Sequence, residues 1–433
     1  MNKRIILSLA ALLGAALCLN AQSFQEGFFL RNYNLAYQYN PAFVGDNDFL
    51  SAGKLGYSIR NNVGAGSFLF PDGGSLLTGL NSSIPAETFP GALPENSRIK
   101  GMMDISLVSY GFRRGDAFHT IELNLRGTAD VSVPKEVFGF LKQGTGVGTV
   151  DLGRFHVEDN VFAELAYGYG HKVNDWLSLG ARAKLLVPVQ GAGCDITRLD
   201  VTASQELLLI GFRGRLDMTG SPDKKKRFWL NGGGLAVDLG IVATPAEGLT
   251  MSLSLLDLGG MFWHYGKGYS SVGSFAFKGF DKLGSDQLNG QYLKDYFLEK
   301  GMDFVKSLKP MQQRSWWEWQ WLPVQANLGI KYEMPFYRRL ALGATGRYLG
   351  CAGLPYWEGR FGLEINPLDW LDMTGNFGKG SQGLVYGFAA AVRICRFRLT
   401  AGYQNGCSGT VPYSSVSIGP NFKSMTLSLT YDL

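Results

Sequence analysis

The most informative absence in the sequence is that of a long apolar run. After the apolar stretch at residues 5–19, no segment of the 433-residue chain approaches the roughly 18 consecutive apolar residues of a membrane-spanning helix. The hydrophobic residues, 45% of the chain, are instead spread over short alternating segments. This distribution excludes an ordinary inner-membrane protein built from helices.

Cysteine is also scarce, with five residues in the chain. Cys18 lies in the early apolar stretch, and the other four show no C-x-x-C spacing, so we expect no zinc site. Disulfides are chemically permitted in an exported protein, but four widely spaced cysteines define no scaffold. Their pairing stays open, including that of Cys395 with Cys407.

Motifs of enzymes and of cofactor sites are missing as well. The sequence has no G-x-x-x-x-G-K-[ST] phosphate loop, no G-x-S-x-G elbow and no H-E-x-x-H, and its histidines have no partner at metal-ligand spacing. We therefore expect no enzymatic activity, no cofactor and no metal. Lipid hydrolysis of the outer-membrane phospholipase kind would place a serine two residues from a lipid-facing histidine, but His119 has Ile121 at that position.

The N-terminus carries an export signal. Lys3 and Arg4 precede the apolar stretch, and Ala21 is a small residue at a cleavage point, so residues 1–21 are predicted to be a Sec signal peptide. Lipidation of Cys18 is the alternative, which Leu17 before it disfavours. Cleavage would remove two positive charges and lower the net charge from +5 to +3, which suggests no nucleic-acid partner.

A strict two-residue alternation runs from Ala117 to Val133. Apolar or small residues occupy the odd positions from 121 to 133, and polar residues occupy the even positions from 120 to 132. A period of two predicts an extended strand, and this one exceeds the roughly 9 to 11 residues that a tilted strand needs to cross a bilayer. The apolar phase would face lipid and the polar phase an aqueous interior. A soluble sandwich would bury the same apolar phase, and alternation alone does not separate the two.

The lengths of the connections favour the membrane alternative. Tight turns near residues 114–116, 174–175, 245–248, 335–339, 367–369 and 395–396 join predicted hairpins, whereas the links between hairpins are usually longer. This asymmetry is typical of outer-membrane barrels, whose short turns face the periplasm. We predict an all-β, transmembrane antiparallel β-barrel of about 14 strands, with 12–16 allowed because residues 195–217 form either a strand pair or an extracellular hairpin.

The predicted organisation is a signal peptide (1–21), an N-terminal plug-like segment (22–50) and a barrel (51–433) that closes through an alternating strand at the chain end. The link between residues 258 and 322 is the longest. Its residues 285–309 predict two short amphipathic helices, a helical insertion that we place outside the cell. A further short helix is predicted at residues 135–142. The basic run at residues 224–227 could contact lipopolysaccharide phosphates, although such a run is more often a solvated loop.

Charged residues in the polar phase of the predicted strands would face the lumen. They either pair across it, which limits the cost of desolvation, or form a selectivity ring along a substrate path, and we favour pairing. These candidate lumen-facing charges are Glu122, Arg126, Asp130, Glu164, Arg182, Lys184, Asp238, Lys331, Glu333, Arg347, Arg360, Glu364, Asp372 and Arg393.

Aromatic residues crowd two further places. Trp316, Trp317, Trp319 and Trp321 predict an aromatic girdle at the membrane interface, with a ligand platform in the mouth as the alternative. The segment before the first strand supplies candidate plug and ligand contacts, which are Phe28, Phe29, Tyr33, Tyr37, Tyr39 and Asn40.

Several motifs resemble an uncharacterised family of Bacteroidota outer-membrane barrels. They are the FLRNY sequence at residues 29–33, YQYNPA at 37–42, LLDLG at 255–259 with Trp263, and residues 275–280. The Asn-Pro-Ala element at 40–42 is more distantly similar to the start of long-chain fatty-acid transporters and of the type 9 secretion shuttle barrel. The resemblance implies an N-terminal segment plugging a 14-stranded barrel, and it implies no activity. The insertion at 285–309 is foreign to the fatty-acid transporters, so their ligand pocket is not carried over.

Two functions are compatible with this sequence. The first is binding or passage of a hydrophobic or amphipathic small molecule, with aromatic residues of the plug and of the long loop at the entry site. The second is a non-conducting barrel that acts as a scaffold for a surface or secretion complex. In either case we expect an outer-membrane location, with membrane lipid and lipopolysaccharide as surroundings.

Overall fold

The computed structural model describes residues 25–31, 33–62, 94–143, 148–203, 208–219, 231–277, 309–310, 316–350, 354–407 and 421–433. The expected signal peptide, the basic run at 224–227 and the expected helical insertion, apart from Lys309, lie outside these residues. No helix among the described residues is long and apolar enough to cross a membrane.

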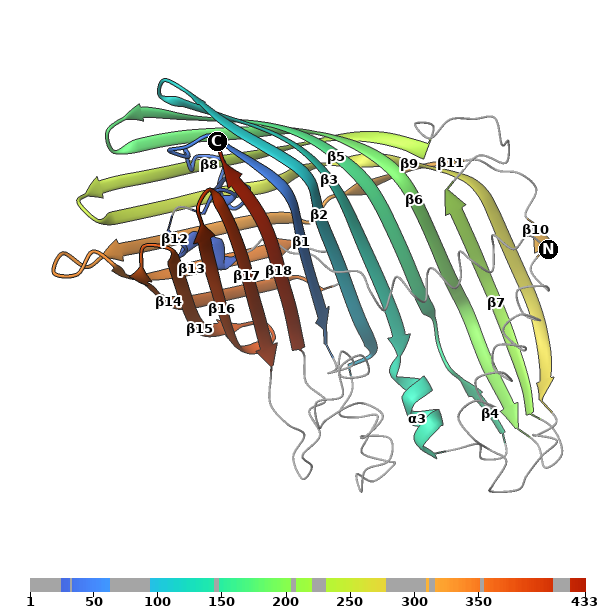
Figure 1. Cartoon of the computed structure of the whole chain (residues 1–433). Coiled ribbons are helices and arrows are strands. Elements are labelled where there is room, and N and C mark those ends of the chain that lie inside the picture. The colour runs from blue at the N-terminus through green and yellow to red at the C-terminus, as the bar shows by residue number, and fades with distance from the viewer. Residues whose placement is uncertain are drawn as a thin grey trace.

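One antiparallel sheet closes on itself to form a barrel (Figure 1). Closure occurs where the first strand, β1 (Phe49–Asn61), pairs with both β2 (Asn96–Arg114) and the last strand, β18 (Asn421–Asp432). The ring has 14 strands, which confirms the predicted fold class. Its remaining members are β3 (Ala117–Pro134), β5 (Phe155–Asn174), β6 (Leu177–Ala203), β8 (Gly232–Ala246), β9 (Leu249–Phe277), β12 (Val324–Glu333), β13 (Leu340–Gly350), β14 (Tyr356–Leu368), β15 (Leu371–Gly380), β16 (Gly383–Ile394) and β17 (Phe397–Cys407).

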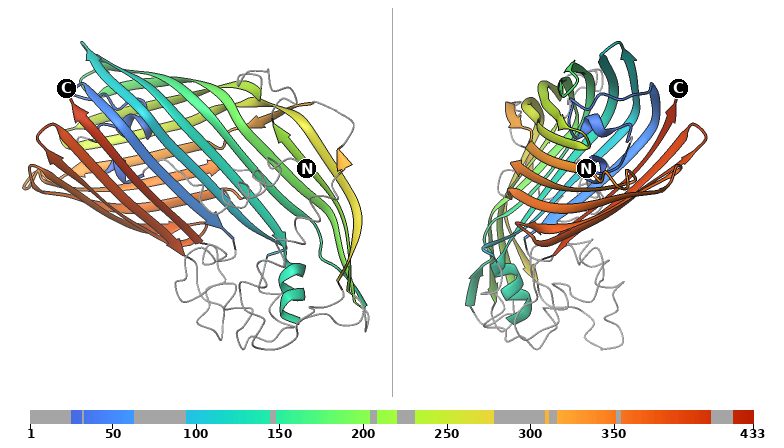
Figure 2. Two further views of the ribbon diagram at one scale, coloured as in Figure 1. Left: turned by 45° about the vertical axis from the view of Figure 1, so that its right-hand side comes forward. Right: turned by 90° about the vertical axis from the view of Figure 1, so that its left-hand side faces the viewer.

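The wall is much taller on one side than on the other, as both views of Figure 2 show. β6 and β9 have 27 and 29 residues, whereas β15 has 10, close to the roughly 9 to 11 that cross a bilayer. At the tall side β7 (Leu208–Thr219) lies between the far ends of β6 and β9, where β8 lies nearer the short turns. Residues 195–217 therefore extend the wall as a hairpin and add no strand to the ring.

Three short elements complete the tall side. β4 (Gly148–Asp151) pairs with the far end of β6, and β10 (Lys309–Pro310) and β11 (Trp316–Trp321) pair with β9. The helix α3 (Lys135–Gln143) follows β3 directly, as the sequence predicted.

The direction of the side chains excludes a soluble sandwich. Large apolar residues such as Leu253, Phe361 and Leu427 are exposed on the outer face, while the alternate polar residues, among them Ser252, Arg360 and Thr426, are buried inside. A soluble sandwich would show the reverse arrangement, with apolar residues buried between sheets. The outward apolar face is what an outer-membrane barrel presents to lipid.

The outer face of β18 offers a test of this arrangement. Leu427→Arg places a charge at mid-strand and should lower the free energy of unfolding in lipid vesicles by about 2–4 kcal/mol, the cost near the bilayer midplane. Leu433→Arg, on the same face at the short-turn end, should cost at most about 1 kcal/mol. Denaturant unfolding followed by tryptophan fluorescence measures both, and equal effects would contradict a bilayer centred on the strand.

Candidate functional site

The N-terminal segment folds back into the barrel at the short-turn end, where Figure 2 shows it enclosed by the strands. It contains two single turns of 3-10 helix, η1 (Gln25–Phe28) and η2 (Ala36–Gln38). Phe28, Phe29 and Tyr39 pack together in one buried cluster, with the Phe28 and Phe29 ring centroids 5.4 Å apart. Residues 25–48, here called the plug, thus have a small core of their own.

A second cluster joins the plug to the wall. Tyr33 and Tyr37 of the plug are buried with Phe49 of β1 and Phe118 of β3. The Tyr37 and Phe49 ring centroids are 6.0 Å apart. The half of the lumen nearest the short turns is here called the inner half, and the other half the outer half. Packing of five predicted plug and ligand contacts fills the inner half, and Asn40 lies among them; the five are Phe28, Phe29, Tyr33, Tyr37 and Tyr39.

Glycines in the wall make room for the plug. A Cβ atom on Gly240 of β8 would lie 1.9 Å from the Asn40 Oδ1, and one on Gly180 of β6 would lie 2.2 Å from the Pro41 carbonyl. A Cβ on Gly362 of β14 would lie 2.6 Å from the Phe29 ring. The plug fits at this level because these positions carry no side chain.

Asn40 of the Asn-Pro-Ala element joins a local turn of the plug to the wall of the barrel. Its Oδ1 accepts a hydrogen bond from the Ala42 N–H at 2.9 Å, which closes a local turn. Its Nδ2 donates to the Ser252 Oγ at 2.8 Å and to the Ile241 carbonyl at 2.9 Å. Aspartate could make the turn but has no donor, so only an amide satisfies both sets of partners.

Glu26 ties the plug to β14, β15 and β17. Its carboxylate forms an ion pair with Arg360 at 3.0 Å and accepts hydrogen bonds from Asn376 and Gln404. Burial raises the pKa of Glu26, while the Arg360 guanidinium lowers it. Arg360 also pairs with Glu358 at 2.6 Å, so the plug joins a charge pair that the wall already holds.

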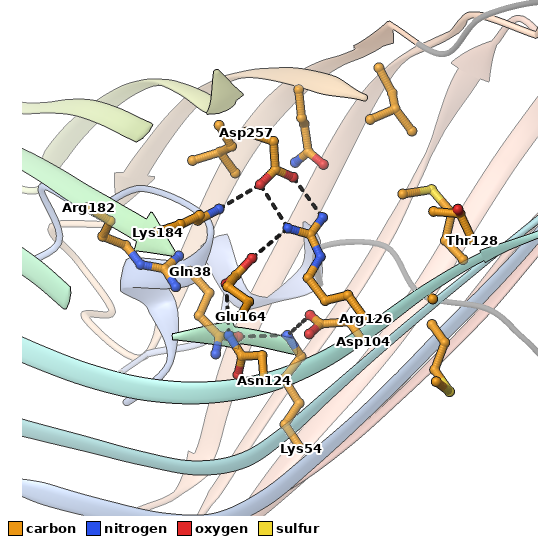
Figure 3. A pocket seen from close by; sticks show the side chains of 16 residues that line it. Gln38, Lys54, Asp104, Asn124, Arg126, Thr128, Glu164, Arg182, Lys184 and Asp257 are labelled. Atoms are coloured by element: carbon orange, nitrogen blue, oxygen red, sulfur yellow. Dashed lines mark hydrogen bonds and ion pairs between the residues drawn. The ribbon is translucent and has the colours of Figure 1, made fainter. Parts of the chain in front are cut away.

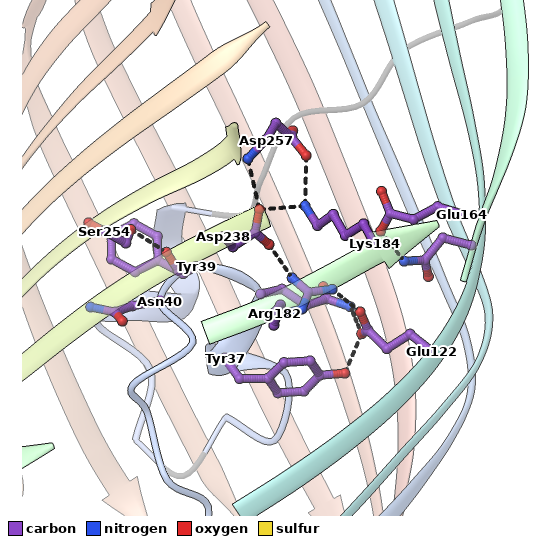
Figure 4. A network of polar contacts seen from close by, with 12 residues as sticks. Tyr37, Tyr39, Asn40, Glu122, Glu164, Arg182, Lys184, Asp238, Ser254 and Asp257 are labelled. Carbon is purple, nitrogen blue, oxygen red and sulfur yellow. Dashed lines mark hydrogen bonds and ion pairs between the residues drawn. The ribbon is translucent and has the colours of Figure 1, made fainter. Parts of the chain in front are cut away.

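Next to the plug, a layer of ion pairs joins β3, β6 and β8 inside the lumen (Figure 4). Arg182 pairs with Glu122 and, at 3.1 Å, with Asp238, and Lys184 pairs with Asp238 at 2.7 Å. Tyr37 of the plug donates a hydrogen bond to Glu122. Burial raises the pKa of Tyr37, so the phenol keeps the proton that it donates. The layer is therefore connected to the plug beneath it.

Asp257 is the central residue of this layer, and the sequence reading did not single it out. Its carboxylate binds Arg126 through two contacts of 2.8 Å and Lys184 at 2.6 Å (Figure 3). Its backbone φ of 61° is uncommon for a residue other than glycine, and its N–H donates to Asp238 at 2.7 Å. The only sequence signal was the LLDLG motif, where the alternation slips by one residue.

That slip is a β-bulge, and it changes which residues face inward. Before the bulge, Ser252 and Ser254 of β9 point into the lumen, whereas after it Met261, Trp263 and Tyr265 do. These three join an apolar cluster with Phe162 and Leu322. The lumen-facing side chains of β9 therefore change from serines before the bulge to large apolar residues after it.

A cavity of about 320 Å³ lies beside this cluster, between the charge layer and the outer opening. Its apolar side includes Met102, Phe162 and Leu322, and its polar side includes Arg60 and the Lys100–Asp130 ion pair of 2.9 Å. A smaller gap of about 60 Å³, shown in Figure 3, lies at the charge layer itself. The larger space suits a molecule with one apolar and one polar part.

The predicted lumen charges are almost all in ion pairs. Besides those named above, Arg126 pairs with Glu164 at 2.8 Å, Lys331 with Glu364 at 3.2 Å, Arg347 with Glu358 at 2.5 Å, and Glu333 with Arg31 of the plug at 3.0 Å. Asp372 and Arg393 differ, because within the described residues neither forms an ion pair.

The tryptophan run lies on β11, and because Trp319 and Trp321 also line the cavity of about 320 Å³, both the girdle and the ligand platform stay predictions. Trp317, Trp319 and Trp321 of β11 are exposed on the outer surface, and the side chain of Trp316 is outside the described part. Phe262 of β9 packs edge-on against Trp319, with ring centroids 4.6 Å apart. Among the described residues, no group of three or more His, Cys, Asp or Glu side chains is placed to hold a metal ion.

Comparison with known proteins places the chain in a family. The family of unknown function DUF5723 matches residues 41–403. The chain belongs to this family. No curated protein matches it. The family assignment agrees with the resemblance to an uncharacterised family, whereas the Bacteroidota source and the similarity to the type 9 secretion shuttle stay predictions.

Solved structures share the fold at low identity. A TodX monoaromatic hydrocarbon channel mutant has a TM-score of 0.50 and 10% identity, covering 92% of this chain and 94% of that one. The Pseudomonas putida toluene transporter TodX has a TM-score of 0.47, 9% identity and 96% coverage of both chains. A Pseudomonas aeruginosa FadL homologue has a TM-score of 0.48 and 13% identity, with 93% and 95% covered.

Substitution of one wall glycine tests whether the wall positions the plug. Gly240→Ala should displace Asn40, because the new methyl group would overlap its side chain. We expect amide hydrogen exchange in residues 33–45 to accelerate about tenfold or more, which mass spectrometry would detect. Gly359→Ala is the matched control, since a Cβ there meets nothing within 4 Å. Unchanged exchange in Gly240→Ala would show that the wall does not position the plug.

The charge layer predicts a large cost at Asp257. Asp257→Ala leaves Arg126 and Lys184 without their shared carboxylate and should lower the free energy of unfolding by about 3–5 kcal/mol. Asp369→Ala removes the exposed pair with Arg339 and should cost at most about 1 kcal/mol. Denaturant unfolding in vesicles gives both numbers, and a small effect at Asp257 would mean that the layer does not stabilise the barrel.

Proposed function

We propose that the protein is an outer-membrane barrel that binds a hydrophobic or amphipathic small molecule in its outer cavity and releases it inward when the plug moves. The observation that carries this proposal is the apolar cluster inside the outer lumen. Water-filled barrel interiors are usually polar, whereas here Phe162 and Leu322 of this cluster line the cavity, which favours an apolar occupant.

Orientation and membrane position follow from the same proposal. The short turns would face the periplasm and the tall wall the cell exterior, as in other bacterial barrels. Among the described residues, the cavity is then the enclosed space nearest the cell exterior. Beneath it, the charge layer and the plug separate the cavity from the periplasm, so passage requires rearrangement. No step of chemical conversion is part of this proposal.

One observation favours a second function, that of a closed scaffold. The buried charges of the layer neutralise one another, and the plug contacts several walls at once, so the resting lumen is filled at mid-height. A permanently closed barrel would leave the tall wall as a platform for a surface or secretion partner. Planar-bilayer recordings with the plug deleted distinguish the two, because a scaffold needs no path that opens.

The proposed ligand site predicts the effect of one aromatic residue. Phe162→Ala removes a buried face of the cavity and should weaken binding of an apolar fluorescent probe such as 1-N-phenylnaphthylamine about tenfold, or about 1.4 kcal/mol. Phe388→Ala, on the outer surface, is the control and should leave the affinity unchanged. Equal probe binding by wild type and Phe162→Ala would place the ligand elsewhere or remove the proposal.

A further inference from the structure

The charges that line the outer cavity are balanced. Its described lining holds two cations, Arg60 and Lys100, and it also holds two carboxylates, Asp130 and Glu158. Lys100 of β2 and Asp130 of β3 lie directly opposite each other and form an ion pair of 2.9 Å, with side chains only 14% and 16% exposed. The described lining therefore presents no net charge to a molecule in the cavity.

The other two charges of the lining also have partners within the protein. Glu158 of β5 accepts hydrogen bonds from Asn160 at 2.6 Å and from Gln320 of β11 at 3.1 Å. Arg60 of β1 is fully buried, and its guanidinium lies over the Tyr356 ring, 5.5 Å from the centroid, an arrangement that stabilises a cation. A charged group on a ligand would have to compete with these partners.

The lining also contains an uncharged polar group that a ligand can contact. Thr128 of β3 lies two residues before Asp130, in the polar phase of the strand, and lines the cavity. Within the described residues its hydroxyl has no hydrogen-bond partner. Because a hydroxyl can both donate and accept, it suits an uncharged polar group such as a hydroxyl or a carbonyl.

We propose that the outer cavity selects amphiphiles whose polar group is uncharged, and that the Lys100–Asp130 pair sets this selectivity. An ion in the cavity would lose its hydration without gaining an unpaired counter-charge. An uncharged group loses less hydration and hydrogen-bonds to Thr128, while the apolar part packs on Phe162 and Leu322. This inference rests on the proposed function and adds to it the charge class of the ligand.

Three ten-carbon probes with head groups of similar size test the selectivity. Decyl methyl sulfone is uncharged, decanesulfonate is an anion and decyltrimethylammonium is a cation. Each would displace 1-N-phenylnaphthylamine from the protein in phosphatidylcholine vesicles, with free concentrations corrected for partition into protein-free vesicles. We expect the sulfone to compete about tenfold more strongly than either ion, because a buried charge without a partner costs more than an uncharged polar group.

Variants of the ion pair assign the selectivity to its two charges. Asp130→Asn leaves Lys100 without its carboxylate and should lower the half-displacing concentration of the sulfonate about tenfold, with no gain for the cation. Lys100→Met leaves Asp130 unpaired and should favour the trimethylammonium probe by a similar factor. The double variant, Lys100→Met with Asp130→Asn, is neutral again and is the matched control, so it should restore the wild-type order of the probes.

The contribution of the hydroxyl is measured separately. Thr128→Val keeps the shape of the side chain and removes its hydroxyl, so it should weaken competition by the sulfone about fivefold, the loss of one hydrogen bond. Unchanged competition in this variant would contradict the contact with Thr128.

Two results would overturn the inference. One is competition by either ion as strong as that by the sulfone in wild type, a comparison that needs no variant to fold. The other is the wild-type order of probes in both single variants of the ion pair. In both cases Phe162-dependent binding of 1-N-phenylnaphthylamine would still support the proposed function. If wild type binds neither this dye nor any ten-carbon probe, the proposed function fails, and the inference fails with it.

Discussion

Mutual neutralisation of charges inside the barrel is the interaction on which the rest of this structure depends. Hydrocarbon around the barrel leaves the lumen as the place for polar side chains, and a filled lumen leaves little water to solvate them. Arg182, Lys184 and Arg126 are stable there because carboxylates from other strands lie within about 3 Å of each. Each of these three cations has two carboxylate partners, so removing one carboxylate would halve the compensation of a buried cation.

The strained residue Asp257 connects this electrostatic layer to the shape of the outer lumen. Its left-handed backbone costs free energy, which the Asp238 contact and the two cations offset. The same bulge turns Trp263 and Tyr265 inward, so the residue that completes the charge layer also creates the apolar wall above it. A single backbone irregularity thus changes the lumen-facing side chains of β9 from polar to apolar along the length of the strand.

The plug fills the lumen at the short-turn end of the barrel. Wall glycines leave space for the plug, and the Asn40 amide and the Glu26–Arg360 pair bind it to different strands. Tyr37 links the plug to the charge layer through Glu122. A ligand that disturbs the layer therefore acts on residues that also hold the plug. In the proposed function, this connectivity is the physical route by which a ligand in the outer cavity would act on the plug, although the overall fold alone assigns no substrate.

The sequence by itself determined the antiparallel barrel, a range of strand numbers that includes 14, and the short helix after β3, because these follow from local alternation, strand length and turn length. It also identified the plug aromatics and which charges share the inner phase. Only the tertiary structure decided that Glu122 meets Arg182 and that Asp257 faces the lumen. The reason is that a period of two determines to which face of the sheet each side chain points, but not the register of the strand against strands far along the chain. Register and a one-residue bulge set the positions of the side chains along the barrel axis, and both arise from packing of the whole ring.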